Sequence, residues 1–296
     1  MYTARIEPAL ASNVLTIDDL IELLRSVEGV GRQHIFLYKC DPTVAVKLMD
    51  RSYVEAQLKV IGASHLYEIG PMVLDQPDEP TLVDVTWTSA AVDLSLTIKE
   101  VEQRVTQKLG ETSYSSNSIV KTYVLQKTRV VNVVRLHRDG LLEVRLASHS
   151  GTTYLPDIAR LWKQIEQIIP RNLFQPVHLS KAKGKLFKDK KELEHKIRFS
   201  DSLLRNDEGI TLRAGSGSIN TDLTNSTGAT ESMETFMQYD DAYCDGLNIR
   251  FKVVDGIPSR ETRVLLTGEN HEFAVTSNCS QADYEYILRE LRVLNS

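Results

Sequence analysis

Two acidic residues, Asp84 in TLVDVTW and Glu143 in LLEVRL, stand on predicted strands where they could take part in metal-dependent chemistry. A metal-dependent nuclease gathers carboxylates around a cation, often with a lysine beside them. The neighbour of Glu143 is Arg145, and a guanidinium does not readily release a proton. A cross-strand ion pair explains Glu143 more simply. A divergent nuclease is therefore the alternative, and the sequence favours a protein that is not an enzyme.

Basic residues gather in two stretches, and such residues bind the phosphates or carboxylates of a partner. The segment 181–198 has eight Lys or Arg residues against three acids, although the whole chain has a net charge of −5. The second stretch lies on a predicted hairpin. The residues expected to contact nucleic acid or an acidic protein partner are Lys127, Arg129, Arg135, Arg145, Lys181, Lys183, Lys185, Lys188, Lys190 and Lys191.

Two further features of the sequence bear on this basic surface. Residues 231–245 contain five acids and no Lys or Arg, so the lysines of 181–198 could pair with them inside the fold. The sequence also has no zinc finger, helix-turn-helix or RNP-like aromatic motif. If the partner is a nucleic acid, we expect contacts to its backbone and shape and not to its bases.

Other site chemistry lacks a matching motif. Asp240, Asp241 and Asp245 do not have EF-hand spacing and offer too few oxygens for a hard cation, so they predict a solvated turn. Gly29 and Gly31 predict a helix end, because no GK[ST] follows them. The chain has no GxSxG motif either. We therefore expect no metal and no cofactor.

Asp139 and Gly140 mark the turn of a predicted hairpin spanning residues 119–148. A two-residue turn would place apolar and charged side chains opposite one another. A three-residue loop, residues 138–140, with Gly140 in the left-handed conformation avoids this. The opposite pairs are then Leu136 with Leu142, Val134 with Val144, and Arg135 with Glu143. We expect one side to be apolar and the other to be a charged face with Arg135, His137, Glu143, Arg145 and, farther along, Lys127 and Arg129.

The amino-terminal half alternates helical and strand-like patterns around this hairpin. Apolar spacing, caps and turn residues predict helices from Thr16 to Gly29, from Pro42 to about Ile61, over 98–109 and over 156–169. β-Favouring runs predict strands at 34–40, 67–74 and 81–88.

The carboxy-terminal part predicts a second sheet with a helix. A hairpin is expected over 196–205 and 209–214, followed by a mobile surface loop at 214–228. Three short strands then precede a helix from about Gln281 to Leu294, with Ser280 and Asp283 as its cap. The segment 181–198 lacks a sustained apolar stripe, so it is expected to be a connector outside the core.

Length and composition set the class of the protein. With 296 residues, 42% hydrophobic and 25% charged, the chain is expected to form an α+β fold with mixed or antiparallel sheets and flanking helices. Two domains are predicted: 1–175, including a hairpin-plus-helix unit at 119–169, and 199–296, joined by the basic connector 176–198. Three cysteines without CxxC spacing, and no long apolar run, predict a cytoplasmic protein away from the membrane.

These observations favour a non-catalytic binding or assembly component that contacts nucleic acid or an acidic protein through a basic surface. A divergent metal-dependent nuclease and a purely structural subunit of a complex are the alternatives. Homo- or hetero-oligomers are compatible with each of them.

Overall fold

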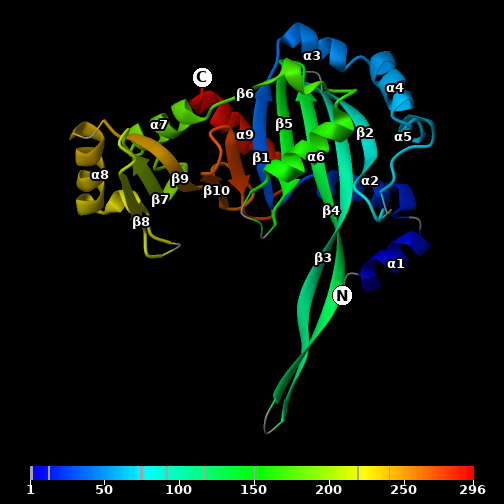
Figure 1. Ribbon diagram of the computed structural model, residues 1–296, viewed down its shortest axis with the longest axis horizontal. Helices are drawn as coiled ribbons and strands as arrows, with labels where there is room; N and C mark the ends of the chain where they lie inside the picture. Colours follow the sequence, from blue (N-terminus) through cyan, green and yellow to red (C-terminus); the bar gives the residue numbers. More distant parts are fainter. Residues whose placement is uncertain are drawn as a thin grey trace.

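The computed structural model of the protein describes residues 3–12, 14–73, 76–90, 93–115, 118–149, 151, 153–218, 220–239 and 241–296 (Figure 1). The amino-terminal half contains α1 (Thr3–Ala11), α2 (Ile17–Glu28), β1 (Gln33–Lys39), α3 (Pro42–Leu48), α4 (Arg51–Val60), α5 (His65–Glu68), β2 (Thr81–Ala90), β3 (Asp93–Ser115), β4 (Ser118–His137), β5 (Leu141–Ala147) and α6 (Leu155–Ile165). The remainder contains η1 (Arg171–Leu173), β6 (Gln175–Pro176), α7 (Ser180–Lys188), β7 (Ile197–Arg205), β8 (Thr211–Gly215), η2 (Leu223–Asn225), α8 (Thr227–Tyr239), β9 (Tyr243–Phe251), β10 (Thr262–Leu266), β11 (Glu272–Val275) and α9 (Gln281–Leu294).

Within these residues, eleven strands form one sheet in the order β2-β3-β4-β5-β1-β11-β10-β9-β7-β8, with β6 added beside β1. The paired strands are antiparallel. The predicted α+β class with flanking helices is therefore confirmed. Strand β1 pairs with β5 on one edge and with β11 on the other. The strands before and after the predicted connector 176–198 therefore belong to one continuous sheet. The division into domains stays a prediction.

Strand β1 contributes to apolar layers on both sides of the sheet. Phe36 and Tyr38 belong to a core with Trp162 of α6, whereas Ile35 and Leu37 belong to a second core with Ile287 of α9. Figure 1 shows α6 crossing β4 and β5 on the near side, with α9 behind β1. A strand that is buried on both sides has a continuous run of apolar residues. The run IFLY in β1 therefore indicates a buried strand in the sequence alone.

The predicted register of the β4–β5 hairpin is confirmed. Leu136 lies opposite Leu142, Val134 opposite Val144 and Arg135 opposite Glu143. Gly140 has a φ of +89°, in the left-handed region that the three-residue loop requires. Local turn chemistry and apolar alternation are therefore enough to define this pairing.

The helix predicted over 98–109 is wrong, because these residues belong to the long strand β3. Val101, Val105 and Leu109 are spaced by four, an interval that keeps side chains on one side of a strand as well as of a helix. Ile98 falls on the opposite side of the strand, in the α6 core. Pairing with β4 along nearly the whole length of β3 decides between the two periods.

Two other amino-terminal predictions need correction. The helix from Pro42 to Ile61 is two helices, since Asp50 accepts a hydrogen bond from the Tyr53 amide and begins α4. The strand over 67–74 is not formed: α5 covers its first residues, and no strand follows up to Val73, while Leu74 lies outside the described residues.

The carboxy-terminal predictions fare better. Strands β7, β8, β9, β10 and β11 are confirmed, and Ser280 and Asp283 form the predicted capping box of α9. The expected loop at 214–228 instead contains η2 and the beginning of α8, with Leu223 buried; Ile219 is not among the described residues. Segment 181–198 also contributes to the core, since α7 buries Leu186 and Phe187. Each of the described helices is too short or too polar to cross a membrane.

Candidate partner-binding arm

Strands β3 and β4 continue past the sheet as a two-stranded arm, defined here as residues 105–128. Pairing of β2 with β3 ends at Val101, and pairing of β5 with β4 ends at Val133. Beyond these positions the described residues of β3 and β4 pair with each other, down to Ser115 opposite Ser118. Figure 1 shows the arm extending far from the body of the molecule.

The two sides of the arm differ in chemistry. Because side chains alternate along β4, residues 119, 121, 123, 125 and 127 share a side with their partners on β3. This apolar side carries six large residues, each 51–76% exposed: Val105, Leu109, Tyr114, Ile119, Tyr123 and Leu125. The opposite side is mainly polar, with Thr106, Lys108, Ser113, Thr122 and Gln126 beside Val120 and Val124. An isolated two-stranded ribbon is marginal in water, and contiguous exposed apolar side chains mark interaction surfaces.

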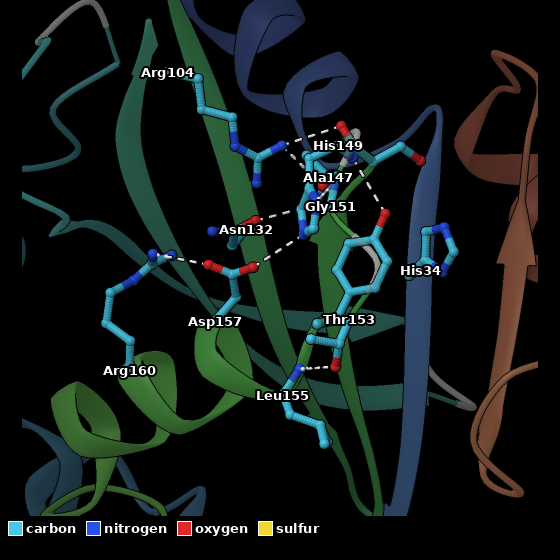
Figure 2. A network of polar contacts seen from close by, with 12 residues as sticks. His34, Arg104, Asn132, Ala147, His149, Gly151, Thr153, Leu155, Asp157 and Arg160 are labelled. Carbon is cyan, nitrogen blue, oxygen red and sulfur yellow. Dashed lines mark hydrogen bonds and ion pairs between the residues drawn. The ribbon is translucent and has the colours of Figure 1, made fainter.

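A polar network holds the root of the arm on the α6 side of the sheet (Figure 2). Arg104 donates from Nη1 to the carbonyl oxygens of Ala147 and Ser148, over 3.0 Å each. The same guanidinium lies 2.6 Å from Glu102, which in turn lies 2.7 Å from Arg160 of α6. The arm is therefore fixed at its root by buried or half-buried ion pairs, which hold geometry better than exposed ones.

His149 extends this network at the start of α6. Its Nδ1 accepts a hydrogen bond from the Gly151 amide at 2.8 Å, so Nε2 carries the proton directed at Asp157, 3.0 Å away (Figure 2). The ring of Tyr154 lies between the rings of His149 and His34, at centroid distances of 4.1 and 4.0 Å. Both nitrogens of His149 are thus engaged, and the ring links the segment before α6 to Asp157 of that helix.

Helix α2 clamps the arm root from the other side of the sheet. Arg129 pairs with Glu28, and Arg25 makes a two-pronged contact with Asp84 at 2.9 and 3.3 Å. Lys99 donates to the Arg25 carbonyl at 2.6 Å and lies 3.5 Å from Asp84. Burial lowers the pKa of Lys99, although Asp84 opposes that change. Asp84, a predicted catalytic candidate, is therefore engaged by two cations.

A cleft of about 930 Å³ opens between α2 and the start of α9. Four cations and three carboxylates line it: Arg25, Lys99, Arg135, Arg145, Glu22, Asp84 and Glu285. Arg135 pairs with Glu285, and Arg145 donates to the Gly29 carbonyl at 3.2 Å. The cleft is nearly balanced in charge, and its ion pairs connect α2 and α9 to the sheet.

Glu143, the other catalytic candidate, lies fully buried beneath α9. Tyr284 donates its hydroxyl hydrogen to Glu143, His137 contacts the second carboxylate oxygen, and Arg145 lies 3.7 Å away. Burial alone would raise the pKa of Glu143, but Arg145, the His137 hydrogen bond and Arg135 outweigh burial and lower it to about 2. In the described residues, no group of three or more His, Cys, Asp or Glu side chains could hold a metal ion.

The charged face predicted for the hairpin is real in register but wrong in exposure. Arg135 and Arg145 are only 7% and 3% exposed, and α9 covers them. Arg129 is half-buried against α2. Lys127 differs, because it lies on the arm with a side chain that is 61% exposed. The hairpin pattern could not show this, because the covering helices are distant in sequence.

The lysines of 181–191 separate into two groups. Lys190 pairs with Glu234 at 2.9 Å, so the alternative of pairing with the acids of 231–245 holds for this residue. Lys183 instead donates to the backbone carbonyl of Asp245 at 2.6 Å. Burial lowers the pKa of Lys183. The others are exposed: Lys181, Lys185, Lys188 and Lys191. Asp240 of the acidic stretch lies outside the described residues.

The arm itself is absent from the sequence-based predictions. The first strand of the arm was missed because residues 98–109 were predicted to be a helix. The feature of the sequence that indicates the second strand is the high content of Val, Ile, Thr and Tyr from 119 to 131. Comparison of the sequence with protein-family models and with curated proteins finds no match.

Proposed function

We propose that this protein is a non-catalytic binding or assembly component whose arm contacts an acidic protein partner. The observation that carries the proposal is the apolar side of the arm, with six exposed large residues held away from the body. Three lysines, Lys108, Lys121 and Lys127, lie on the arm against one acid, Glu111.

Two features favour a protein over a nucleic acid as the partner of the arm. Protein interfaces combine an apolar, aromatic centre with a charged rim, and Tyr114 and Tyr123 lie among aliphatic residues with lysines beside them. Nucleic-acid contacts depend mainly on cations, and three lysines over a ribbon of this length are few. The lysine excess would steer an acidic partner toward the arm and disfavour a basic one.

The root ion pairs support the same role. Contacts from Arg104 on one side and Arg129 on the other fix where the arm leaves the sheet. A projection that is oriented before it meets its partner loses less entropy on binding than a floppy one. The arm is therefore suited to reach into a partner while the sheet stays in place.

The test reverses the chemistry of one side of the arm. Leu109 lies opposite Tyr123, and the double variant Leu109→Glu/Tyr123→Glu places two charges on the apolar side. The matched control, Thr106→Glu/Gln126→Glu, adds the same charge to the opposite side at a neighbouring cross-strand pair. Each variant places two like charges opposite each other, which costs up to about 1 kcal/mol, and the cost is matched because both pairs are exposed. Both should therefore remain folded.

Proteins captured by the full chain would be identified by mass spectrometry with and without nuclease treatment, and then purified for direct affinity measurement. The apolar-side variant is expected to weaken the interaction at least about tenfold, while the control changes it about twofold or less. Equal losses in both variants would contradict the proposal. Capture abolished by nuclease would assign the arm to nucleic acid, and light scattering that shows self-association through the arm would replace the acidic partner with a second copy.

A further inference from the structure

One side of strands β7, β9 and β10 carries a row of arginines. Phe199, Ile249 and Val264 point to the core shared with α9. The alternate side carries Arg198, Arg250 and Arg263, which form the arginine row. In Figure 1 the near side of β9 and β10 has no helix across it, unlike β4 and β5 under α6.

The three arginines are direct cross-strand neighbours. Arg198 is the register partner of Arg250, and Arg250 is the register partner of Arg263. Neighbouring strands lie about 4.8 Å apart, so the three guanidiniums are attached along a line about 10 Å long. Like charges placed directly opposite each other destabilise a sheet. The fold therefore tolerates a repulsive arrangement at this position.

A single glutamate is shared between two members of the arginine row. Glu261 lies 3.0 Å from Nη2 of Arg198 and 3.6 Å from Nε of Arg250, the latter too far for a hydrogen bond. Arg263 donates from Nε to the amide oxygen of Asn248, at 2.9 Å. The next carboxylate along this side, Asp201, lies 3.1 Å from Arg213. Glu261 therefore faces both Arg198 and Arg250, and Arg263 donates to a neutral acceptor.

The pKa of Arg250 is lowered, in part by this crowding. Burial lowers its pKa first, Glu261 opposes the change, and the positive charges of Arg263 and Arg198 lower it further. A bound anion would offset the repulsion between the guanidinium groups of the arginine row. Such an anion would gain charge-assisted hydrogen bonds from guanidiniums that the fold already holds in place.

We propose that this row binds the phosphates of a single nucleic-acid strand. Guanidinium groups match phosphate geometry, and a line of them on an open sheet fits a linear polyanion better than a compact ligand, which needs an enclosing pocket. Two hollows lie beside the row. One, of about 420 Å³, is lined by Arg198, His195 and Lys252 together with Glu194 and Asp222. The other, of about 310 Å³, is lined by Arg263, Arg213 and Asn248 together with Asp201.

Contacts to bases have no platform at this site. The linings of both hollows, as far as the chain is described, contain no Phe, Tyr or Trp on which a base could stack. Binding should therefore be insensitive to sequence and steeply dependent on salt. The row lies on β7, β9 and β10, apart from the arm on β3 and β4, so the inference does not depend on the proposed function of the arm.

The experiment measures fluorescence anisotropy of a labelled thymidine oligonucleotide with the full chain over a salt series. Contact with three phosphates predicts a slope of log affinity against log salt near −2, about −0.7 per phosphate. Arg250→Gln and Arg263→Gln should each weaken binding about tenfold or more and reduce that slope by about 0.7. Arg289→Gln on α9, on the other side of the sheet, is the matched control and should leave binding unchanged.

The variant Glu261→Gln is expected to change oligonucleotide binding in the opposite direction from the arginine variants. Removing the shared carboxylate should tighten oligonucleotide binding about threefold while lowering the melting temperature, since the row loses an internal counter-charge. This variant remains decisive even if an arginine variant fails to fold. Weaker binding in Glu261→Gln, or equal losses in Arg250→Gln and Arg289→Gln, would overturn the inference. Binding of pyrophosphate without binding of the oligonucleotide would also overturn it. The arm variant Leu109→Glu/Tyr123→Glu should bind the oligonucleotide like the unaltered chain.

Discussion

Replacement of Glu143 with glutamine is expected to lower the free energy of unfolding by about 3 kcal/mol, because a buried charge network loses its central anion. The carboxylate is fully buried and contacts Tyr284, His137 and Arg145. Glutamine keeps the size of the side chain but leaves these cations and donors without that negative charge. Urea unfolding followed by circular dichroism measures the loss.

The matched control is Glu22→Gln, since the Glu22 side chain is 75% exposed and lies 3.4 Å from Arg25. An exposed pair of this kind contributes about 0.5 kcal/mol or less. If the two substitutions differed by under about 1 kcal/mol, the Glu143 network would not be a principal source of stability.

The same network has a defined pH dependence. The pKa of Glu143 is lowered from 4.5 to about 2, so its contribution is complete above about pH 4.5 and is lost as the pH falls toward 2. At about 1.36 kcal/mol for each of roughly 2.5 pH units, that contribution is about 3 kcal/mol. Stability measured over this interval should therefore fall less steeply in Glu143→Gln than in the unaltered chain. Parallel curves would contradict the assignment.

Substitution of Gly140 with alanine is the second large expected effect, with a loss of about 3 kcal/mol or more in the free energy of unfolding. A Cβ at this position would lie 2.2 Å from the carbonyl oxygen of Cys40, and the φ of +89° is itself unfavourable for alanine. Backbone must shift to relieve the contact, and the Cys40 amide donates to the Gly140 carbonyl at 3.0 Å in the same region.

The variant Gly209→Ala separates the steric contact with Cys40 from the backbone strain of a positive φ. Gly209 has a φ of +84°, and a Cβ added there would meet nothing within 4 Å, so its substitution reports backbone strain alone, about 1 kcal/mol. Thermal and urea unfolding of both variants give the comparison. Similar losses at the two glycines would show that the approach of Cys40 to the loop is easily relaxed.

Local patterns predicted a substantial part of the fold. The three-residue loop around Gly140 and the alternation of Leu136, Val134, Leu142 and Val144 define one pairing because any slip would expose apolar side chains. The capping box of α9 is likewise local, since Ser280 and Asp283 are three residues apart. Such signals need no partner from elsewhere in the chain.

Patterns that fit two structures were resolved by contacts distant in sequence. The spacing of Val101, Val105 and Leu109 suits a helix face and a strand side, and pairing with β4 selects the strand. For Arg135 and Arg145 the sequence indicated which side of the strand they occupy. It carried no information on whether a helix more than a hundred residues later would cover that side.

The sequence by itself therefore determined the β4–β5 register, the strands and helix at the carboxyl end, and the α+β class, because turn chemistry, caps and alternation act over a few residues. Only the tertiary structure decided that Arg135 and Arg145 are buried and that residues 105–128 form a projecting arm. It also aligned Arg198, Arg250 and Arg263, which are not adjacent in the sequence. Burial and cross-strand alignment depend on where remote segments pack, and that information lies in the whole fold.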